Sequence, residues 1–345
     1  MPIAVPADSA TLSLRAPLSF APAYQVVVWG GQKMATYRDD VPSGPVGESW
    51  DLADQARGMS VVRGGPWNGT TLRDLTALRG KDLVGDDFPG GLFPLLVKLI
   101  DASDRLSVQV HPDDELAAKM GLGSNGKTEC WLMVGAGGEL FQGTRPGVNR
   151  QEFESALAQG RVQETLNRYA TNDGDFFFLQ ARTVHALGRN CLLYEVQQTS
   201  DITFRVWDWG RVGLDGKPRP LHIEESLDTI DFSRDGFGPV SSNLQAHASG
   251  GLVRPLADCA YFQVEERVLA SRDDGTSFFC TGPRVCSVLT CLEGQGEICT
   301  EGGALMLSAM QTVLVPAAAG GWQAKAAKSP FKLMHTVPKL AVAAP

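Results

Sequence analysis

Hydrophobic residues along this chain fall mostly into short runs that are interrupted by turn residues. The segments Tyr24–Trp29, Leu95–Ile100 and Cys191–Val196 are rich in β-branched, aromatic and leucine side chains, and a Gly, Asp or Asn borders each of them. Short apolar runs between turn residues are typical of β-strands. Similar runs recur along most of the chain, so the pattern predicts a protein made mainly of short strands.

Only a few stretches carry a helical pattern instead. Short helices are predicted at residues 71–78, 113–120, 150–170 and 223–230. Thr71 precedes the first of them and is a suitable N-cap, because its hydroxyl can accept a hydrogen bond from the first turn. The region 150–170 is the longest of the four, and Gly160 interrupts its periodicity.

A polar stretch divides the strand-rich chain into two blocks. Residues 233–250 are rich in Gly and Ser and read as a linker. We therefore expect a first domain over residues 1–250, with a short helical insert near 150–170, and a second over residues 251–345. Many short strands with regular turns on both sides predict two β-barrels.

Composition narrows the classes of function. The 345 residues carry a formal net charge of −8 with a pI near 5.2, which argues against a nucleic-acid partner. No apolar run is long enough to span a bilayer, and residues 1–8 lack the features of a signal peptide. None of the seven cysteines forms a C-x-x-C pair, so we expect reduced thiols and a cytoplasmic protein without a membrane partner.

Four polar residues form a candidate metal site. Gln109 and His111 are two apart in an otherwise apolar run, so on a strand both side chains point to one face. Buried polar groups need partners, and a metal ion held together with Glu129 and His185 would supply one. This ligand set suits zinc, and it would also accept cobalt, manganese or iron. A histidine satisfied within the core is the alternative.

The segment Gly174–Asn190 resembles the second motif of the cupin superfamily. It has a Gly-Asp pair, an apolar strand, a turn, His185 and then Asn190. The first cupin motif normally offers His-x-His and a nearby Glu, whereas this chain has Gln109-x-His111 and a longer excursion to Glu129. These departures point to one branch of the superfamily.

That branch is the type I mannose-6-phosphate isomerases, also called phosphomannose isomerases, in their short bacterial form. The resemblance covers most of the chain. It runs through Trp29–Gly31, Gly47–Trp50, Phe93–Lys98, Leu106–Asp114, Gly126–Trp131, Thr183–Gly188, Glu195–Asp201 and Phe204–Arg211. It implies a mainly β fold of two cupin-type barrels (jelly rolls) with a few short helices. The block after Gly251 has only His335 and, nearby, His247, so we expect it to form a barrel that binds no metal.

The resemblance also implies the reaction, which interconverts mannose 6-phosphate and fructose 6-phosphate through a cis-enediol. The small-molecule partner is then a sugar phosphate, and one zinc ion per chain is the expected cofactor. The implied roles are as follows: Gln109, His111, Glu129 and His185 as metal ligands, Arg205, Lys127 and Glu195 as catalytic residues, and Ser107 and Arg211 as phosphate contacts.

Several alternatives stay open for individual residues. Arg205 also suits a structural ion pair, for instance with Asp208, and Lys127 or Arg211 a surface position. Glu195 also suits a buried ion pair, and the general base is open between Glu195, Lys127 and a zinc-bound water. Many family members have a histidine after the motif tryptophan that helps to open the sugar ring. This chain has none there, so Asp54 or the open-chain sugar would serve instead.

Other functions also stay open. One is the isomerisation of another sugar or sugar phosphate, and another is an iron-dependent cupin dioxygenase or epimerase. A non-catalytic sugar-binding cupin is the third, although Lys127 and Arg205 argue against it. The remaining histidines look unconnected to the site: we expect His222 to be structural and both His247 and His335 to be incidental.

Overall fold

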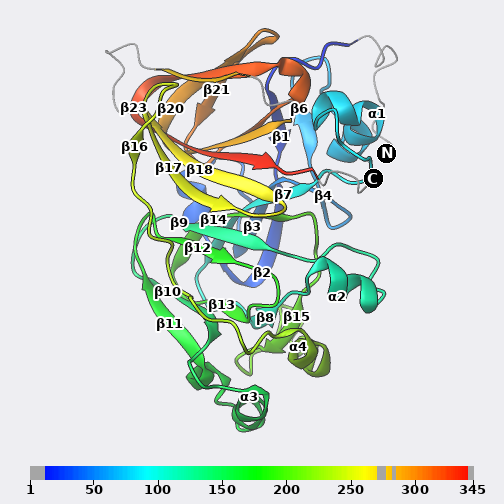
Figure 1. The fold of residues 1–345 in the computed structure, drawn as a ribbon, viewed down its shortest axis with the longest axis vertical. Coiled ribbons are helices and arrows are strands. Elements are labelled where there is room, and N and C mark those ends of the chain that lie inside the picture. Colours follow the sequence, from blue (N-terminus) through cyan, green and yellow to red (C-terminus); the bar gives the residue numbers. More distant parts are fainter. Residues whose placement is uncertain (1–11, 270–276, 282–284, 341–345) are drawn as a thin grey trace. The chain divides into compact units, whose positions relative to one another are not determined.

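The computed structural model describes residues 12–269, 277–281 and 285–340 (Figure 1). The described chain is mainly β, with four α-helices and three short 3-10 helices. None of the described helices combines the length and the apolar character that a membrane crossing requires. The contacts divide the chain into two compact units. Unit 1 holds residues 1–23, 50–96 and 241–345, and unit 2 holds residues 24–49 and 97–240.

Unit 1 is built on one ten-stranded antiparallel sheet. Its path is β16 (Gln245–Ala246), β17 (Leu252–Asp258), β18 (Phe262–Leu269), β23 (Gly321–Pro338), β20 (Ser287–Thr300), β22 (Thr312–Val315), β1 (Leu18–Ala21) and β6 (Val61–Arg63), with β19 (Ser277–Thr281) beside β23 and β21 (Gly303–Ser308) beside β20. The small pair β4 (Asp54–Gln55) and β5 (Gly58–Met59), helix α1 (Leu72–Leu83) and the 3-10 turn η3 (Ala317–Ala319) complete it.

Unit 2 contains most of the residues of two further sheets. The five-stranded sheet has the order β11 (Leu166–Thr171), β10 (Gly138–Thr144), β13 (His185–Leu187), β8 (Val108–Val110) and β15 (Phe204–Trp207). The six-stranded sheet has the order β12 (Phe176–Leu179), β9 (Glu129–Met133), β14 (Cys191–Gln198), β7 (Leu95–Ala102), β2 (Ala23–Gly31) and β3 (Val46–Leu52). The helical elements are η1 (Lys33–Thr36), α2 (Asp114–Lys119), α3 (Arg150–Ala158), η2 (Val162–Thr165) and α4 (Ile223–Thr229).

The two sheets of unit 2 share an apolar core. Leu140 and Leu187 from the five-stranded sheet cluster with Trp131 and Leu193 from the six-stranded sheet, and all four are at most 1% exposed. Burial of one such side chain stabilises the fold by about 1.5–3 kcal/mol. This core holds the strands that carry the candidate site.

The sequence pattern predicted most of these elements. Thr71 caps α1 as expected, because its side chain accepts a hydrogen bond from the Asp74 amide. The prediction of a helix through 150–170 is wrong in its second half. Helix α3 ends at Ala158, Gly160 has a φ of +68°, and residues 166–171 form strand β11 beside β10.

The grouping of the chain differs in part from the predicted domains. Residues 1–23 and 50–96 belong with the C-terminal unit, whereas the prediction placed them in the first domain. The reason is strand pairing, because β1 lies between β22 and β6 in the ten-stranded sheet. A division based on composition could not detect a strand that pairs with a partner almost three hundred residues away, as Leu18 does with Leu314.

Candidate metal and substrate site

Three neighbouring strands of unit 2 bring the predicted polar residues into one row. His185 on β13 pairs with Gln109 on β8, and Arg205 on β15 pairs with Gln109 from the other side. Directly opposed residues of antiparallel strands point to the same face of a sheet. The row therefore presents Arg205, Gln109 and His185 together, and His111 follows on the face of Gln109.

The backbone fixes the orientation of both imidazole rings. Nδ1 of His111 lies 2.8 Å from the carbonyl oxygen of Ile202, and Nδ1 of His185 lies 2.9 Å from that of Thr183. A carbonyl oxygen only accepts hydrogen bonds, so each Nδ1 carries the proton. In a neutral ring Nε2 then bears a lone pair, which is the arrangement that metal-binding histidines adopt.

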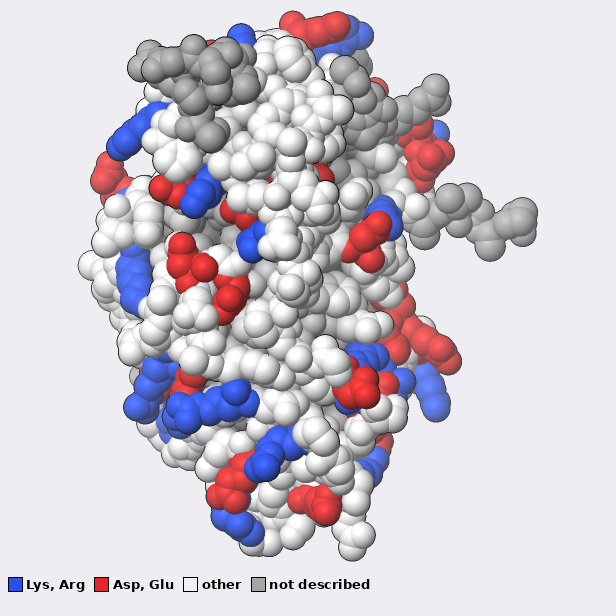
Figure 2. All heavy atoms as spheres, turned by 60° about the vertical axis from the view of Figure 1, so that its left-hand side comes forward, with Lys and Arg blue, Asp and Glu red and all other residues white. Residues whose placement is uncertain are grey.

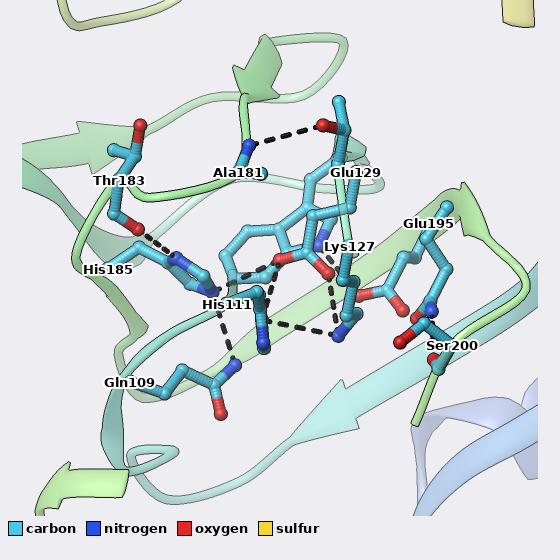
Figure 3. Close-up of polar contacts among 12 residues, drawn as sticks. Gln109, His111, Lys127, Glu129, Ala181, Thr183, His185, Glu195 and Ser200 are labelled. Atoms are coloured by element: carbon cyan, nitrogen blue, oxygen red, sulfur yellow. Dashed lines mark hydrogen bonds and ion pairs between the residues drawn. The ribbon is translucent and has the colours of Figure 1, made fainter. Parts of the chain in front are cut away.

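Both Nε2 atoms face the carboxylate of Glu129 (Figure 3). Oε1 of Glu129 lies 3.0 Å from Nε2 of His185 and 3.7 Å from Nε2 of His111. The three side chains are at most 2% exposed, and the ammonium of Lys127 is a further polar group beside this carboxylate. Two lone pairs and a carboxylate that converge in a buried space repel one another unless a cation lies between them.

This donor set fits a divalent metal ion. Within the described chain, His111, Glu129 and His185 offer ligand atoms that all lie within 4.8 Å of one another. Gln109 adds an amide, whose Nε2 lies 3.2 Å from Nε2 of His185. A half-turn of that amide would present its oxygen instead. Two imidazole nitrogens, a carboxylate and an amide oxygen are then available as four ligands.

Lys127 points into this group of residues instead of lying on the surface. It is 5% exposed, and its Nζ lies 2.8 Å from Oε2 of Glu129 and 3.3 Å from Nε2 of His111. Burial and the Lys127 charge lower the pKa of His111 to about 3, which keeps that ring neutral. Burial alone would raise the pKa of Glu129, but the charge of Lys127 holds it well below its usual range.

Glu195 belongs to a buried ion-pair network. Its Oε1 lies 3.0 Å from Nζ of Lys98, which is also 3.4 Å from Glu48, and its Oε2 accepts a hydrogen bond of 2.7 Å from Nε1 of Trp131. Burial raises the pKa of Glu195, although Lys98 opposes this. Burial alone would lower the pKa of Lys98, but Glu195 and Glu48 outweigh it and raise the value.

Lys98 and Glu48 were not among the predicted site residues. The signal was present, because Lys98 interrupts the apolar run Leu95–Ile100, and a buried lysine requires a partner. Its counter-ions come from β3 and β14, and only the fold brings them together.

Arg205 is held by backbone groups. Its Nη1 donates to the carbonyl of Pro220 over 2.9 Å, and its Nε is buried without a hydrogen-bond partner among the described residues. The alternative of an ion pair with Asp208 is wrong, because Asp208 receives Arg211 and Arg219 instead. Burial lowers the pKa of Arg205, and the charge of Arg219 adds to this effect.

The two predicted phosphate contacts lie in different settings. Ser107 is buried at 3% exposure, directly before β8. Arg211 binds Asp208 over 2.9 Å, lies 3.6 Å from Asp104 and donates to the carbonyl of Arg105. It is therefore a paired arginine, not a solvated one.

The remaining singled-out residues have structural surroundings. His222 precedes α4, and its Nδ1 accepts a hydrogen bond from the backbone amide of Arg205. Asp54, considered for ring opening, is fully buried and accepts hydrogen bonds from Arg73 and from the amide of Phe93. His335, expected to be incidental, is also buried and hydrogen-bonded through both ring nitrogens.

Charge on the surface is mixed. On the face drawn in Figure 2, basic and acidic side chains of the described residues lie interspersed among uncharged ones. Ion pairs of unit 2 include Arg189 with Asp104 and Arg168 with Glu139.

Comparisons with known proteins agree on one family. The sequence model described as "Phosphomannose isomerase type I, catalytic domain" matches residues 18–128. Mannose-6-phosphate isomerase ManA of Bacillus subtilis is 36% identical over 250 residues, which cover 72% of this chain and 78% of that protein. Mannose-6-phosphate isomerase of Streptococcus mutans is 37% identical over 60% of this chain and 65% of its own.

A solved structure extends the similarity to almost the whole chain. The crystal structure of mannose 6-phosphate isomerase from Bacillus subtilis superposes with a TM-score of 0.83 at 26% identity. The match covers 93% of this chain and 99% of that one.

Proposed function

Because the chain belongs to the type I phosphomannose isomerase family, we propose that it is an enzyme that interconverts mannose 6-phosphate and fructose 6-phosphate. The observation that carries the proposal is the convergence of two imidazole lone pairs and a buried carboxylate at His111, His185 and Glu129. The reaction moves a proton between C1 and C2 through a cis-enediol, and a cation in the site suits the negative charge that develops on oxygen.

One zinc ion per chain is the cofactor that we propose. Gln109, His111, Glu129 and His185 would hold it, and their nitrogen and oxygen donors support zinc, with other divalent metals as alternatives. When bound, the ion would polarise sugar oxygens or organise the pocket as a Lewis acid.

The protein's own residues would move the proton and stabilise charge. Glu195 is a candidate general base, since burial brings the pKa of its carboxyl closer to neutral. Lys127 is the second candidate, because its Nζ lies within the ligand group, and it would accept the proton as the neutral amine. Arg205 would stabilise the developing negative charge through its unpartnered Nε.

Ser107 and Arg211 would bind the phosphate. The planar guanidinium of Arg211 suits phosphate oxygens, and the sugar phosphate would compete with Asp104 for it. Each unit would form a cupin-type barrel, and the C-terminal unit would bind no metal. A cytoplasmic location, suggested by the free cysteines of the described chain, completes the proposal.

The test is turnover of mannose 6-phosphate to fructose 6-phosphate before chelation, after chelation and after zinc add-back. We expect activity that a chelator removes and zinc restores. Activity that survives complete metal removal would contradict the metal's role. A metal-loaded protein that turns over only free mannose or another sugar phosphate would contradict the substrate. Binding of these sugars without any turnover would favour a sugar-binding protein.

A further inference from the structure

We infer that Gln198 and Asp114 form an amide–carboxylate clamp that positions Lys127 for the reaction. This inference rests on the proposed function, in which Lys127 lies among the reacting groups. The clamp is a set of hydrogen bonds around the segment Gly126–Glu129. Among the described residues, neither Gln198 nor Asp114 hydrogen-bonds to the side chain of a proposed metal ligand.

The segment itself has no regular secondary structure before β9 begins at Glu129. Its course therefore depends on contacts with its neighbours. The Lys127 amide donates to the carbonyl of Pro112 over 2.9 Å, and the amide of Ala181 donates to Oγ1 of Thr128 over 3.2 Å. These two bonds fix the Lys127 backbone and the Thr128 side chain. The backbone amide of Thr128 is bonded by a side chain instead.

Gln198, the last residue of β14, takes that amide. Its side-chain Oε1 accepts a hydrogen bond from the backbone amide of Thr128 over 2.9 Å. The backbone amide of Gln198 donates to the Thr128 carbonyl over 3.1 Å. Gln198 is 4% exposed, so water cannot easily replace these bonds. The Thr128 peptide directly follows Lys127, which has no regular secondary structure. Glu129 is also anchored by the pairing of β9 with β12 and β14, so the loss of the clamp should displace Lys127 more than Glu129.

Asp114 holds the other end of Gln198. Nε2 of Gln198 donates to Oδ1 of Asp114 over 3.1 Å, and the same oxygen accepts from the Gly126 amide over 2.7 Å. A Cβ at Gly126 would lie only 2.4 Å from the backbone of Asp113, so only glycine permits this close approach. Helix α2 is thereby tied to both sides of Lys127.

The hydrogen-bond polarity of the clamp provides a sharp test. Gln198→Glu keeps an acceptor for Thr128 but places a second carboxylate against Asp114, and two like charges repel at this distance. Asp114→Asn alone keeps an acceptor for Gly126 and Gln198. In the double variant Asp114→Asn with Gln198→Glu, the side-chain NH2 at position 114 donates to the carboxylate at position 198. The hydrogen bond between the two side chains is then restored with its direction reversed.

We expect Gln198→Glu to lower kcat about 10- to 100-fold, since small displacements of a reacting group cost this much. KM should stay within about twofold and metal content unchanged. Asp114→Asn should stay within about threefold of the wild type, and the double variant should return to that range. An unchanged kcat in Gln198→Glu, a failure of the double variant to recover, or a loss of metal that parallels kcat would overturn the inference.

A second measurement separates this inference from the proposed function. Hydrogen exchange of the peptide that contains Thr128 should rise in Gln198→Glu and recover in the double variant, whatever the substrate is. Wild-type protein that turns over no mannose 6-phosphate would contradict the proposed function alone. Unchanged exchange in Gln198→Glu would contradict the clamp alone.

Discussion

Two buried histidine–glutamate groups, one in each unit, use the same residue types in opposite ways. In unit 1, Nδ1 of His335 lies 2.8 Å from Glu265, Nε2 lies 3.0 Å from Oγ of Ser287, and Arg267 binds Glu265 over 2.5 Å. In unit 2, His111 and His185 use Nδ1 for backbone carbonyls and turn Nε2 toward Glu129.

The difference lies in where the proton and the counter-charge are. Glu265 has its own arginine and accepts a hydrogen bond from Nδ1 of His335, so that group is complete without an ion. Glu129 faces lone pairs, and Lys127 is the cation closest to it among the described contacts. A buried histidine beside a glutamate is therefore no sign of a metal site by itself. What decides is whether the protonated Nδ1 or the lone pair of Nε2 faces the carboxylate.

The largest expected effect is the loss of metal and of turnover when one of the unit 2 histidines is removed. His185→Ala should lower bound metal well below one ion per chain and reduce turnover at least about 1000-fold, because a ligand of the site is lost. His335→Asn is the matched control in unit 1, and it should keep metal and turnover. Metal analysis by mass spectrometry and a coupled isomerase assay check both. Full metal content in His185→Ala would remove this residue from the ligand set.

The next prediction compares the half-buried Arg205 of unit 2 with the buried Arg267 of unit 1. Arg205→Ala should lower kcat about 100-fold with metal content unchanged, since Arg205 lies outside the ligand group and would act on developing charge. Arg267→Met should leave kcat unchanged and lower stability, because it removes the counter-ion of Glu265. Steady-state kinetics and urea unfolding distinguish the outcomes. Metal loss in Arg205→Ala would show that its assigned role is wrong.

The ion pair and hydrogen bond of Glu265 predict how stability changes with acid. Burial raises the pKa of Glu265, but the His335 hydrogen bond and the Arg267 charge lower it to about 2. The unfolded chain takes up this proton first, so stability from Glu265 is present above about pH 4.5 and is lost as pH falls toward 2.

Glu265→Gln should therefore cost about 2 kcal/mol of unfolding free energy at pH 7, after a discount for solvent screening. The difference in unfolding free energy between the wild type and Glu265→Gln should become smaller as pH falls from 5 toward 3.5. Urea unfolding across this range measures it, with the chain free of metal so that Glu129 adds no metal-linked change. A gap that widens with acid would contradict the sign.

The smallest effect concerns the two serines. Ser107→Ala should raise KM for the sugar phosphate about three- to fivefold, the cost of one hydrogen bond, with kcat nearly unchanged. Ser287→Ala should leave KM unchanged and lower stability by about 1 kcal/mol, because it removes the partner of His335. Equal KM values for wild type and Ser107→Ala would exclude Ser107 from phosphate binding.

The residues of the candidate site were easier to predict from the sequence than the groups that hold them in place. Gln109 and His111 interrupt an apolar strand, and such a polar pair requires a partner wherever the strand lies. The carbonyl groups that fix the rings, from Thr183 and Ile202, leave no trace in the sequence, since every residue has a carbonyl. The Gln198 clamp is equally invisible because it depends on a strand end that meets a loop.

Two features that the sequence pattern did not reveal depend on the pairing of strands. Residues 166–171 continue the apolar spacing of α3, but Gly160 turns the chain and β10 supplies a strand partner for them. His335 looked isolated because Glu265 and Ser287 are distant in sequence, and only the register of β18 and β20 against β23 makes them neighbours. Tertiary pairing decided both cases.

The backbone carbonyls of Ile202 and Thr183 also link this protein to its metal supply. They hold two imidazole lone pairs against Glu129 in the folded chain, an arrangement that the unfolded chain lacks. An ion that binds only the folded state adds about 2.7 kcal/mol of stability at roughly 100 times its dissociation constant. Scarcity of the ion would therefore shorten the lifetime of the protein itself, since proteases degrade the unfolded fraction.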